Sequence, residues 1–145
     1  MKKTITTLIF MMSLYAFGQK QVPYVSGGAS ITHLKDYSVG GEVGLWGIKS
    51  PLSLGVTCYT MPKYGDTYIG IKPYFTIADK PMWSAMLYTN PQFALNRNLF
   101  VIEEGAGLNY NVNKNFLLGY YFGLQHSKDA ATTVMLSGSI VFLIK

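Results

Sequence analysis

The sequence predicts an all-β protein, an eight-stranded antiparallel up-and-down transmembrane β-barrel preceded by a cleaved signal peptide. Polar, turn-rich clusters recur at regular intervals after residue 20, and the segments between them carry almost no charge. Seven such clusters leave eight segments of roughly ten or more residues, the length of a tilted strand that crosses a bilayer. The clusters are HLKD (33–36), KSP (49–51), PKYGD (62–66), ADKP (78–81), NRN (96–98), NKN (113–115) and SKDA (127–130).

Residues 1–18 are predicted to be a signal peptide, and the barrel domain is placed at 19–145. Lys2 and Lys3 form a positively charged start, an apolar core follows at 5–17, and the segment ends in small residues. This is the pattern that a signal peptidase recognises. The apolar core is shorter than the ~20 residues of a spanning helix, which disfavours the alternative of a retained membrane anchor.

Composition excludes several classes of function. The chain has 12 Lys and Arg against 7 Asp and Glu, and loss of the signal peptide would leave a net charge of +3. The basic residues are scattered singly through turns, so nucleic-acid binding is not predicted. Cys58 is the only cysteine and cannot form an internal disulfide. No metal-ligand spacing and no glycine loop for a nucleotide occurs, so we expect neither a metal nor a cofactor.

Alternation of apolar and polar residues defines the strands, because successive side chains of a strand point to opposite faces. The first segment, 22–32, alternates less cleanly than the next three, which are 37–48, 52–59 and 67–77. The clearest is the second, where Tyr37, Val39, Gly41, Val43 and Leu45 oppose Ser38, Gly40, Glu42, Gly44 and Trp46. These segments are therefore strands with one apolar face.

The fifth and sixth segments contain irregularities. In 82–94, Pro91 has no N–H for the hydrogen-bond ladder, so we expect a bulge or a strand end beside it. In 99–111, Glu104 shares a face with apolar residues. A charge that faces lipid is costly, and a bulge at Glu104 and its neighbours would turn this side chain inward. Whether Glu104 faces lumen or lipid stays open in the sequence.

The seventh and eighth segments, 116–125 and 133–144, alternate regularly again. Across the strands the polar face is rich in Gly, Ser, Thr, Asn and Tyr, whereas the apolar face is Leu, Val, Ile and Phe. A soluble barrel that binds an apolar ligand would need a charged outside, and these strands have too few charges for one. We therefore expect the apolar face to be outside, and glycines to make room for tyrosine rings inside.

On this pattern, which covers nearly the whole mature chain, the sequence resembles the small OmpA/OmpX-like outer-membrane β-barrels. The resemblance implies the outer membrane of a Gram-negative bacterium, a filled lumen without a general pore, and a structural or interaction role. Membrane lipid and the outer-membrane assembly machinery are the implied partners, and we expect a monomer. One departure is that Phe142 lies three positions before the end, where the class usually ends in an aromatic residue. The physiological role, ligand and protein partner stay open.

Glu42 and Lys72 are predicted to form a polar pair in the lumen. Both lie on the polar face, in the second and fourth segments. A charge inside a narrow barrel must be paired, and the interior of an eight-stranded barrel is narrow enough for two side chains to meet across it. A structural ion pair is the expected role, with a gate or proton path as the alternative.

His126, Ser127 and Asp129 are the candidate catalytic residues, at the end of the seventh segment. Here the chain is somewhat similar to the lipid A deacylases, barrel enzymes in which a Ser is the nucleophile and a His the base. That class spaces the two as His-x-Ser, whereas His126 and Ser127 are adjacent and would face apart on a strand. Asp129 would orient the histidine only if the loop folded back. We therefore predict no catalysis, with a lipid A-modifying hydrolase as the alternative function.

Overall fold

A computed structural model describes residues 20–48, 50–128 and 130–144 of the chain. The predicted signal peptide, residues 1–18, lies outside the described residues, so its cleavage stays a prediction. Within the described ranges, no helix is both long enough and apolar enough to cross a membrane.

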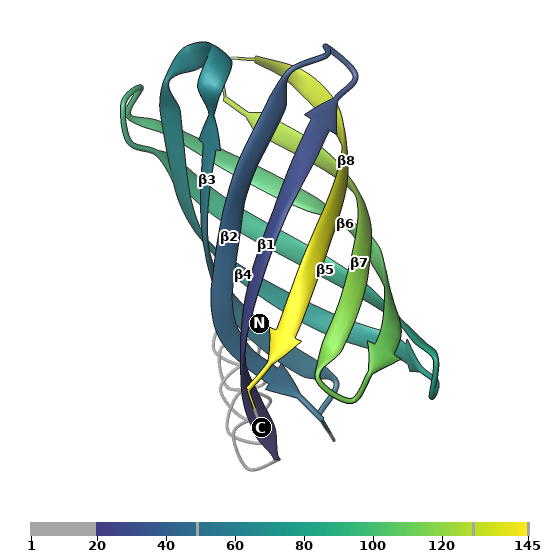
Figure 1. The fold of residues 1–145 in the computed structure, drawn as a ribbon. Helices are drawn as coiled ribbons and strands as arrows, with labels where there is room; N and C mark the ends of the chain where they lie inside the picture. Colours follow the sequence, from purple (N-terminus) through teal and green to yellow (C-terminus); the bar gives the residue numbers. More distant parts are fainter. Residues whose placement is uncertain (1–19, 49, 129, 145) are drawn as a thin grey trace, which may run out of the picture.

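The described chain forms eight antiparallel strands that close into a single barrel (Figure 1). Each strand pairs with its neighbours in the sequence, and β1 pairs with β8 to close the wall. This confirms the predicted all-β, eight-stranded architecture. The strands are β1 (Gln21–Thr32), β2 (Tyr37–Gly47), β3 (Leu52–Met61), β4 (Asp66–Asp79), β5 (Trp83–Ala94), β6 (Leu99–Asn113), β7 (Phe116–Ser127) and β8 (Ala130–Leu143), with one 3-10 turn, η1 (Pro62–Tyr64).

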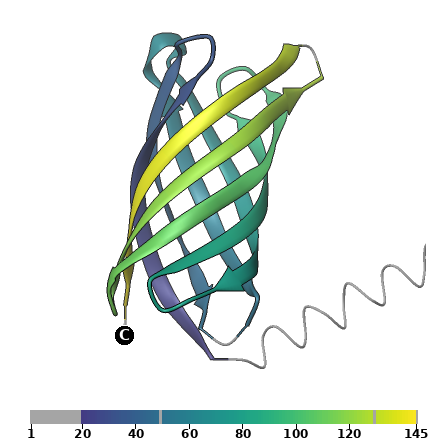
Figure 2. The ribbon, with the colours of Figure 1, turned by 90° about the vertical axis from the view of Figure 1, so that its right-hand side faces the viewer.

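The barrel has two distinct ends, joined by strands that run obliquely around it (Figure 2). The lower end holds the beginning of β1 and the end of β8 (Figure 1), where the Ile144 N–H donates to the Pro23 carbonyl at 2.8 Å. The upper end holds the short connections 33–36, 62–65 and 95–98. Gly65 closes η1 with a φ of 62°, a left-handed conformation that glycine adopts without strain. Short connections at both ends make the wall the main surface of the molecule.

Apolar side chains point out of the barrel and polar ones point into it. On β2, Val43 is 56% exposed, whereas its neighbour Glu42 is 4% exposed. The buried neutral polar residues on the strands are Ser26, Ser30, Thr32, Ser38, Ser53, Thr57, Ser84, Asn90, Gln92 and Asn109. This is the orientation predicted for a wall that faces lipid. It argues against the soluble barrel, whose apolar residues would line the interior.

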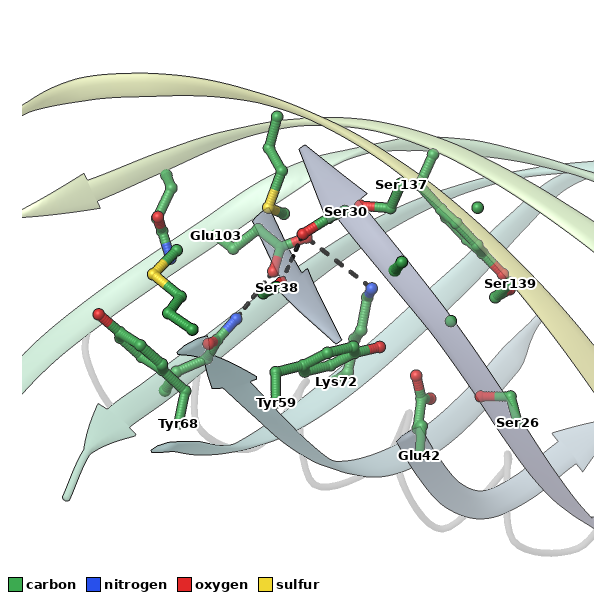
Figure 3. Close-up of a pocket in the computed structure, with 18 of the residues that line it drawn as sticks. Ser26, Ser30, Ser38, Glu42, Tyr59, Tyr68, Lys72, Glu103, Ser137 and Ser139 are labelled. Carbon is green, nitrogen blue, oxygen red and sulfur yellow. Dashed lines mark hydrogen bonds and ion pairs between the residues drawn. The ribbon is translucent and has the colours of Figure 1, made fainter. Parts of the chain in front are cut away.

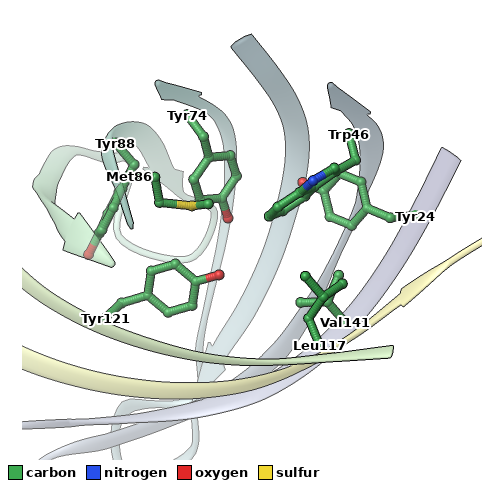
Figure 4. Close-up of a cluster of buried hydrophobic side chains, with 8 residues drawn as sticks. All are labelled: Tyr24, Trp46, Tyr74, Met86, Tyr88, Leu117, Tyr121 and Val141. Carbon is green, nitrogen blue, oxygen red and sulfur yellow. The ribbon is translucent and has the colours of Figure 1, made fainter. Parts of the chain in front are cut away.

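Aromatic side chains fill the lower part of the lumen. Figure 4 shows this cluster, which consists of Tyr24, Trp46, Tyr74, Met86, Tyr88, Leu117, Tyr121 and Val141. Glycines beside the rings leave the space that the rings occupy. A Cβ on Gly44 would lie 2.8 Å from the Tyr24 ring, and one on Gly119 would lie 2.7 Å from the Tyr121 ring. The rings and the glycines therefore form one packed core of the density that barrel interiors require.

The predicted bulge beside Pro91 is wrong. Pro91 pairs with Ile102 inside a continuous β5. Between β4 and β5 the residue pairing is interrupted from Gly70–Gln92 to Tyr74–Tyr88, but the register is the same before and after the interruption. Proline removes a donor without adding a residue, so the ladder loses a bond and keeps its register.

The direction of Glu104, which the sequence left open, is outward in the structure, and no bulge occurs there. The register of β6 against both neighbours is unbroken from Glu103 to Gly105. The Glu104 side chain is 60% exposed on the outside of the wall, and it lies near His126 of β7. Regular alternation therefore sends Glu103 into the lumen and Glu104 outward.

Candidate functional site

Three ionisable side chains from three alternate strands meet inside the barrel. Glu42 of β2, Lys72 of β4 and Glu103 of β6 are all less than 5% exposed. Figure 3 shows them pointing into the same polar space. We refer to these three residues as the lumen charges.

Glu42 is held by two tyrosines. The hydroxyls of Tyr24 and Tyr74 both donate to its carboxylate, the latter at 2.6 Å. Gly55 of β3 lies directly beneath, and a Cβ at that position would collide with the carboxylate. Hydrogen bonds from hydroxyls replace the water that the carboxylate loses on burial, so the two tyrosines offset part of its desolvation cost.

Lys72 lies among a carboxylate and three aromatic rings. Its Nζ is 3.8 Å from Glu103 Oε1. The same Nζ lies 4.1 Å from the centre of the Tyr88 ring, 4.9 Å from that of Tyr121 and 5.4 Å from that of Tyr74. Ring faces attract a cation most strongly when water is excluded. The ammonium is therefore stabilised by one ion pair and by the surrounding ring faces.

Glu103 receives hydrogen bonds from β5 as well as the charge of Lys72. Gln92 Nε2 donates to Glu103 Oε2 at 2.8 Å, and Asn90 Nδ2 donates to the same oxygen at 3.2 Å. Thr57 of β3 in turn donates to Asn90 Oδ1 at 3.2 Å. The amide groups are thus oriented by a chain of polar contacts that crosses the lumen.

The structure brings Glu42 and Lys72 into one network but gives each a different first partner. Among the described residues, the ion pair of Lys72 is with Glu103. Tyr74 connects Glu42 to Lys72. Its hydroxyl donates a hydrogen bond to Glu42, and its ring lies beside the Lys72 ammonium. Sequence reasoning missed Glu103, although the alternation that puts Glu104 on the apolar face also places Glu103 on the lumen face.

Little free space remains between these side chains. The cavity beside the lumen charges has a volume of about 30 Å³, enough for one or two water molecules. Its wall includes Ser26, Ser30, Ser137 and Ser139 (Figure 3). The lumen is therefore closely packed around the three charges.

A second polar cluster closes the upper end of the barrel. Lys63 Nζ donates to Asp36 Oδ1 at 2.6 Å, and the Tyr64 hydroxyl donates to Oδ2 at 2.8 Å. These hydrogen bonds, that from Lys63 foremost, lower the pKa of Asp36. Arg97 pairs with the fully buried Asp66. We refer to Asp36, Lys63, Tyr64, Asp66 and Arg97 as the upper cluster.

His126 contacts a hydroxyl, but it is that of Thr132 rather than Ser127. The distance from His126 Nδ1 to Thr132 Oγ1 is 3.0 Å, and Nε2 lies 3.5 Å from Glu104 Oε1. Ser127 pairs with Ala130 across the end of the hairpin, and Asp129 lies outside the described residues. A register shift between Gln125 and Ser127 inserts an extra residue into β8, and bulges re-aim side chains in this way.

Two further features are the placement of possible metal ligands and the contacts of His33. In the described ranges, no group of three or more His, Cys, Asp or Glu side chains is placed to hold a metal ion. His33, at the upper end, accepts a hydrogen bond at Nδ1 from the Val134 N–H at 3.0 Å, so it joins the first turn to β8.

Comparison with known proteins shows the fold. No protein-family model and no curated protein matches the sequence. A designed transmembrane β-barrel matches with a TM-score of 0.71 at 14% identity, over 85% of this chain and 95% of that one. The N-terminal β-barrel domain of OprF from Pseudomonas aeruginosa has a TM-score of 0.65 at 14% identity, with coverages of 87% and 98%. The outer membrane protein Ail of Yersinia pestis has a TM-score of 0.54 at 13% identity, with coverages of 85% and 100%.

The resemblance to small outer-membrane barrels is therefore confirmed at the level of the fold. The natural neighbours are small barrels of this class, and each is covered almost completely by the present chain. At these identities the likeness concerns architecture, and residues that act in the neighbours do not transfer to this sequence.

Proposed function

We propose that this protein is a small outer-membrane β-barrel of a Gram-negative bacterium, with a structural or interaction role and a filled lumen that is not a general pore. The observation that carries the proposal is the reversed polarity of the wall. Of the Asp, Glu, Lys and Arg residues in the strand interiors, Glu42, Lys72 and Glu103 lie in the lumen and Glu104 lies outside. On the outer face, Val43, Ile71 and Leu108 are more than half exposed. Such a surface is stable in lipid and would aggregate in water.

The filled lumen supports the absence of a general pore. Aromatic rings occupy its lower part, the lumen charges occupy its centre, and the cavity beside these charges is about 30 Å³. The short connections at the upper end offer little surface for a large protein partner, because recognition is concentrated in loops. We therefore propose a monomer that contacts membrane lipid and the outer-membrane assembly machinery.

Cell fractionation and bilayer recordings test this proposal. The protein should fractionate with the outer membrane, and its folded form should migrate faster than its boiled form on a gel. Purified protein in a planar bilayer should give no stable conductance. Recovery in the soluble periplasm would overturn the location, and steady ion conduction would overturn the filled lumen.

A lipid hydrolase is the second candidate function, favoured by the contact between His126 and Thr132. The 3.0 Å distance is within reach for a base and a nucleophile. We propose that the protein is not an enzyme, since Glu104 stands 3.5 Å from the imidazole and holds it less tightly than a catalytic acid does. Mass spectrometry of lipid A from an expressing host distinguishes the two. A lost acyl chain that reappears with Thr132→Val would establish the hydrolase.

A further inference from the structure

A shallow apolar groove crosses the outside of the barrel wall. It has a volume of about 860 Å³ and extends over strands β1, β8, β7, β6 and β5, with Tyr37 of β2 at one margin and Ile77 of β4 at the other. Its floor has the small residues Ala29, Ala85, Ala106 and Gly138, which face outward. A Cβ placed on Gly138 would meet nothing within 4 Å. The groove is therefore a hollow in the wall with room for a chain of methylene groups.

Polar side chains stand immediately above this groove. Glu104 precedes Ala106 by two residues and therefore lies on the same face about 7 Å along β6. In the register of β6 and β7, Ala106 pairs with Phe122, Glu104 with Leu124 and Ile102 with His126. His126 and Thr132 are in contact at 3.0 Å on the upper side. A molecule with an apolar tail in the groove would thus bring its polar end to Glu104.

The charge of Glu104 indicates which polar end fits. Its carboxylate is 60% exposed, its cross-strand neighbours are Thr89 and Leu124, and the nearest basic group is His126 Nε2 at 3.5 Å. An outward carboxylate on an apolar wall is stabilised by a cation from its surroundings. A cation that also donates hydrogen bonds stabilises it most strongly.

We propose that this outward face binds one phospholipid that carries a primary ammonium group, such as phosphatidylethanolamine. An acyl chain lies in the groove over Gly138, and the ammonium donates hydrogen bonds to Glu104 with Thr132 and His126 beside it. This inference rests on the proposed placement in a membrane, because only there is the groove presented to lipid. It assigns the site to lipid rather than to a second copy of the chain, since the lining of the groove has no Lys or Arg that a second copy docked through the same face would bring to Glu104.

Native mass spectrometry of the detergent-solubilised, folded protein tests the proposal. Phosphatidylethanolamine and phosphatidylglycerol with identical acyl chains are added in equal amounts. We expect the wild type to retain phosphatidylethanolamine about fivefold better, the ratio that about 1 kcal/mol of selective binding gives. Glu104→Gln should remove the preference. Gly138→Leu, which fills the groove, should reduce both adducts, whereas Val56→Leu on the outward face of β3 should change neither.

Each alternative gives a distinct result. An unchanged preference in Glu104→Gln would overturn the ammonium site, and unchanged adducts in Gly138→Leu would overturn the groove. A wild-type dimer that Gly138→Leu abolishes would assign the face to a second copy instead. Insertion into phosphatidylcholine vesicles, measured by the gel shift, is a separate control. Failure there would contradict the membrane location, while success with no lipid preference would contradict only this site.

Discussion

Glu103 and Glu104 are neighbours in the chain, yet the two faces of one strand give them opposite surroundings. Glu103 is 3% exposed and is held by Lys72, Asn90 and Gln92. Glu104 is 60% exposed on the outer wall, where His126 is its one basic partner among the residues that the structure describes. The comparison shows that the barrel tolerates a carboxylate in two ways. Inside, a fixed network replaces water, and outside, the surroundings must provide the partner.

We expect the largest effect when each glutamate is exchanged for glutamine. Glu103→Gln leaves the buried Lys72 without its ion-pair partner, and we expect a loss of about 3–5 kcal/mol in the free energy of unfolding. Glu104→Gln should change it by less than about 1 kcal/mol, as for other exposed pairs. Urea unfolding in lipid vesicles measures both.

A double variant controls for simple loss of packing. Lys72→Met combined with Glu103→Gln removes both charges, so it should be more stable than the sum of the two single effects predicts. Equal losses for Glu103→Gln and Glu104→Gln would show that the lumen network does not distinguish the faces.

Glu42→Gln tests the tyrosine-bound carboxylate and should have a smaller effect. Lys72 keeps its ion pair with Glu103, so the variant weakens charge-assisted hydrogen bonds from Tyr24 and Tyr74 without stranding a cation. We expect a loss of about 1.5–3 kcal/mol in the free energy of unfolding. The temperature at which the folded gel band disappears should fall correspondingly. No change in that temperature would mean that the tyrosines bind the neutral amide equally well.

Two glycines test the same difference between the lumen face and the outer face without a change of charge. Gly119 faces the lumen, where a methyl group would press against Tyr121, while Gly138 faces outward into open space. Gly119→Ala should therefore lose about 1–3 kcal/mol in the free energy of unfolding through overpacking. Gly138→Ala should be close to neutral in the same urea titration. If the two variants behaved alike, strand propensity rather than packing would set the requirement for glycine.

We expect the smallest effect on the free energy of unfolding at Asp36 of the upper cluster, and this effect depends on pH. The hydrogen bonds from Lys63 and Tyr64 lower its pKa. Their stabilisation is therefore fully present above the ordinary carboxyl value of about 3.9 and is lost as the pH falls through the lower folded value. Unfolding followed from pH 6 to pH 2 should show this loss in the wild type, and Asp36→Asn should lack that part of it. An identical pH profile for the variant would exclude a role for this cluster.

Alternation along the chain was sufficient to predict the strands, their number and the faces they present. On β2 the same two-residue period places Val43 outside and Glu42 inside, as the structure has them. Partners across the lumen could not be predicted, because they depend on the stagger of the closed sheet, which alternation does not contain. That stagger puts Glu103 rather than Glu42 beside Lys72.

Local irregularities were harder to predict than faces. Pro91 correctly indicates a missing donor, but the ladder tolerates the loss without a bulge. The register shift that does occur near His126 has no proline or glycine to mark it. It decides which hydroxyl the imidazole contacts, so the contact with Thr132 was beyond sequence reasoning.

The lumen network also has a consequence for the order in which the barrel folds. Three of its contacts skip a strand: Tyr74 of β4 donates to Glu42 of β2, Thr57 of β3 donates to Asn90 of β5, and Lys72 of β4 pairs with Glu103 of β6. Hairpins of adjacent strands can form their ladders alone, but they leave Lys72 without its carboxylate and Glu42 without Tyr74. A partly formed sheet would therefore hold uncompensated charges. We expect the barrel to close in a single late, cooperative folding step rather than by stepwise addition of strands.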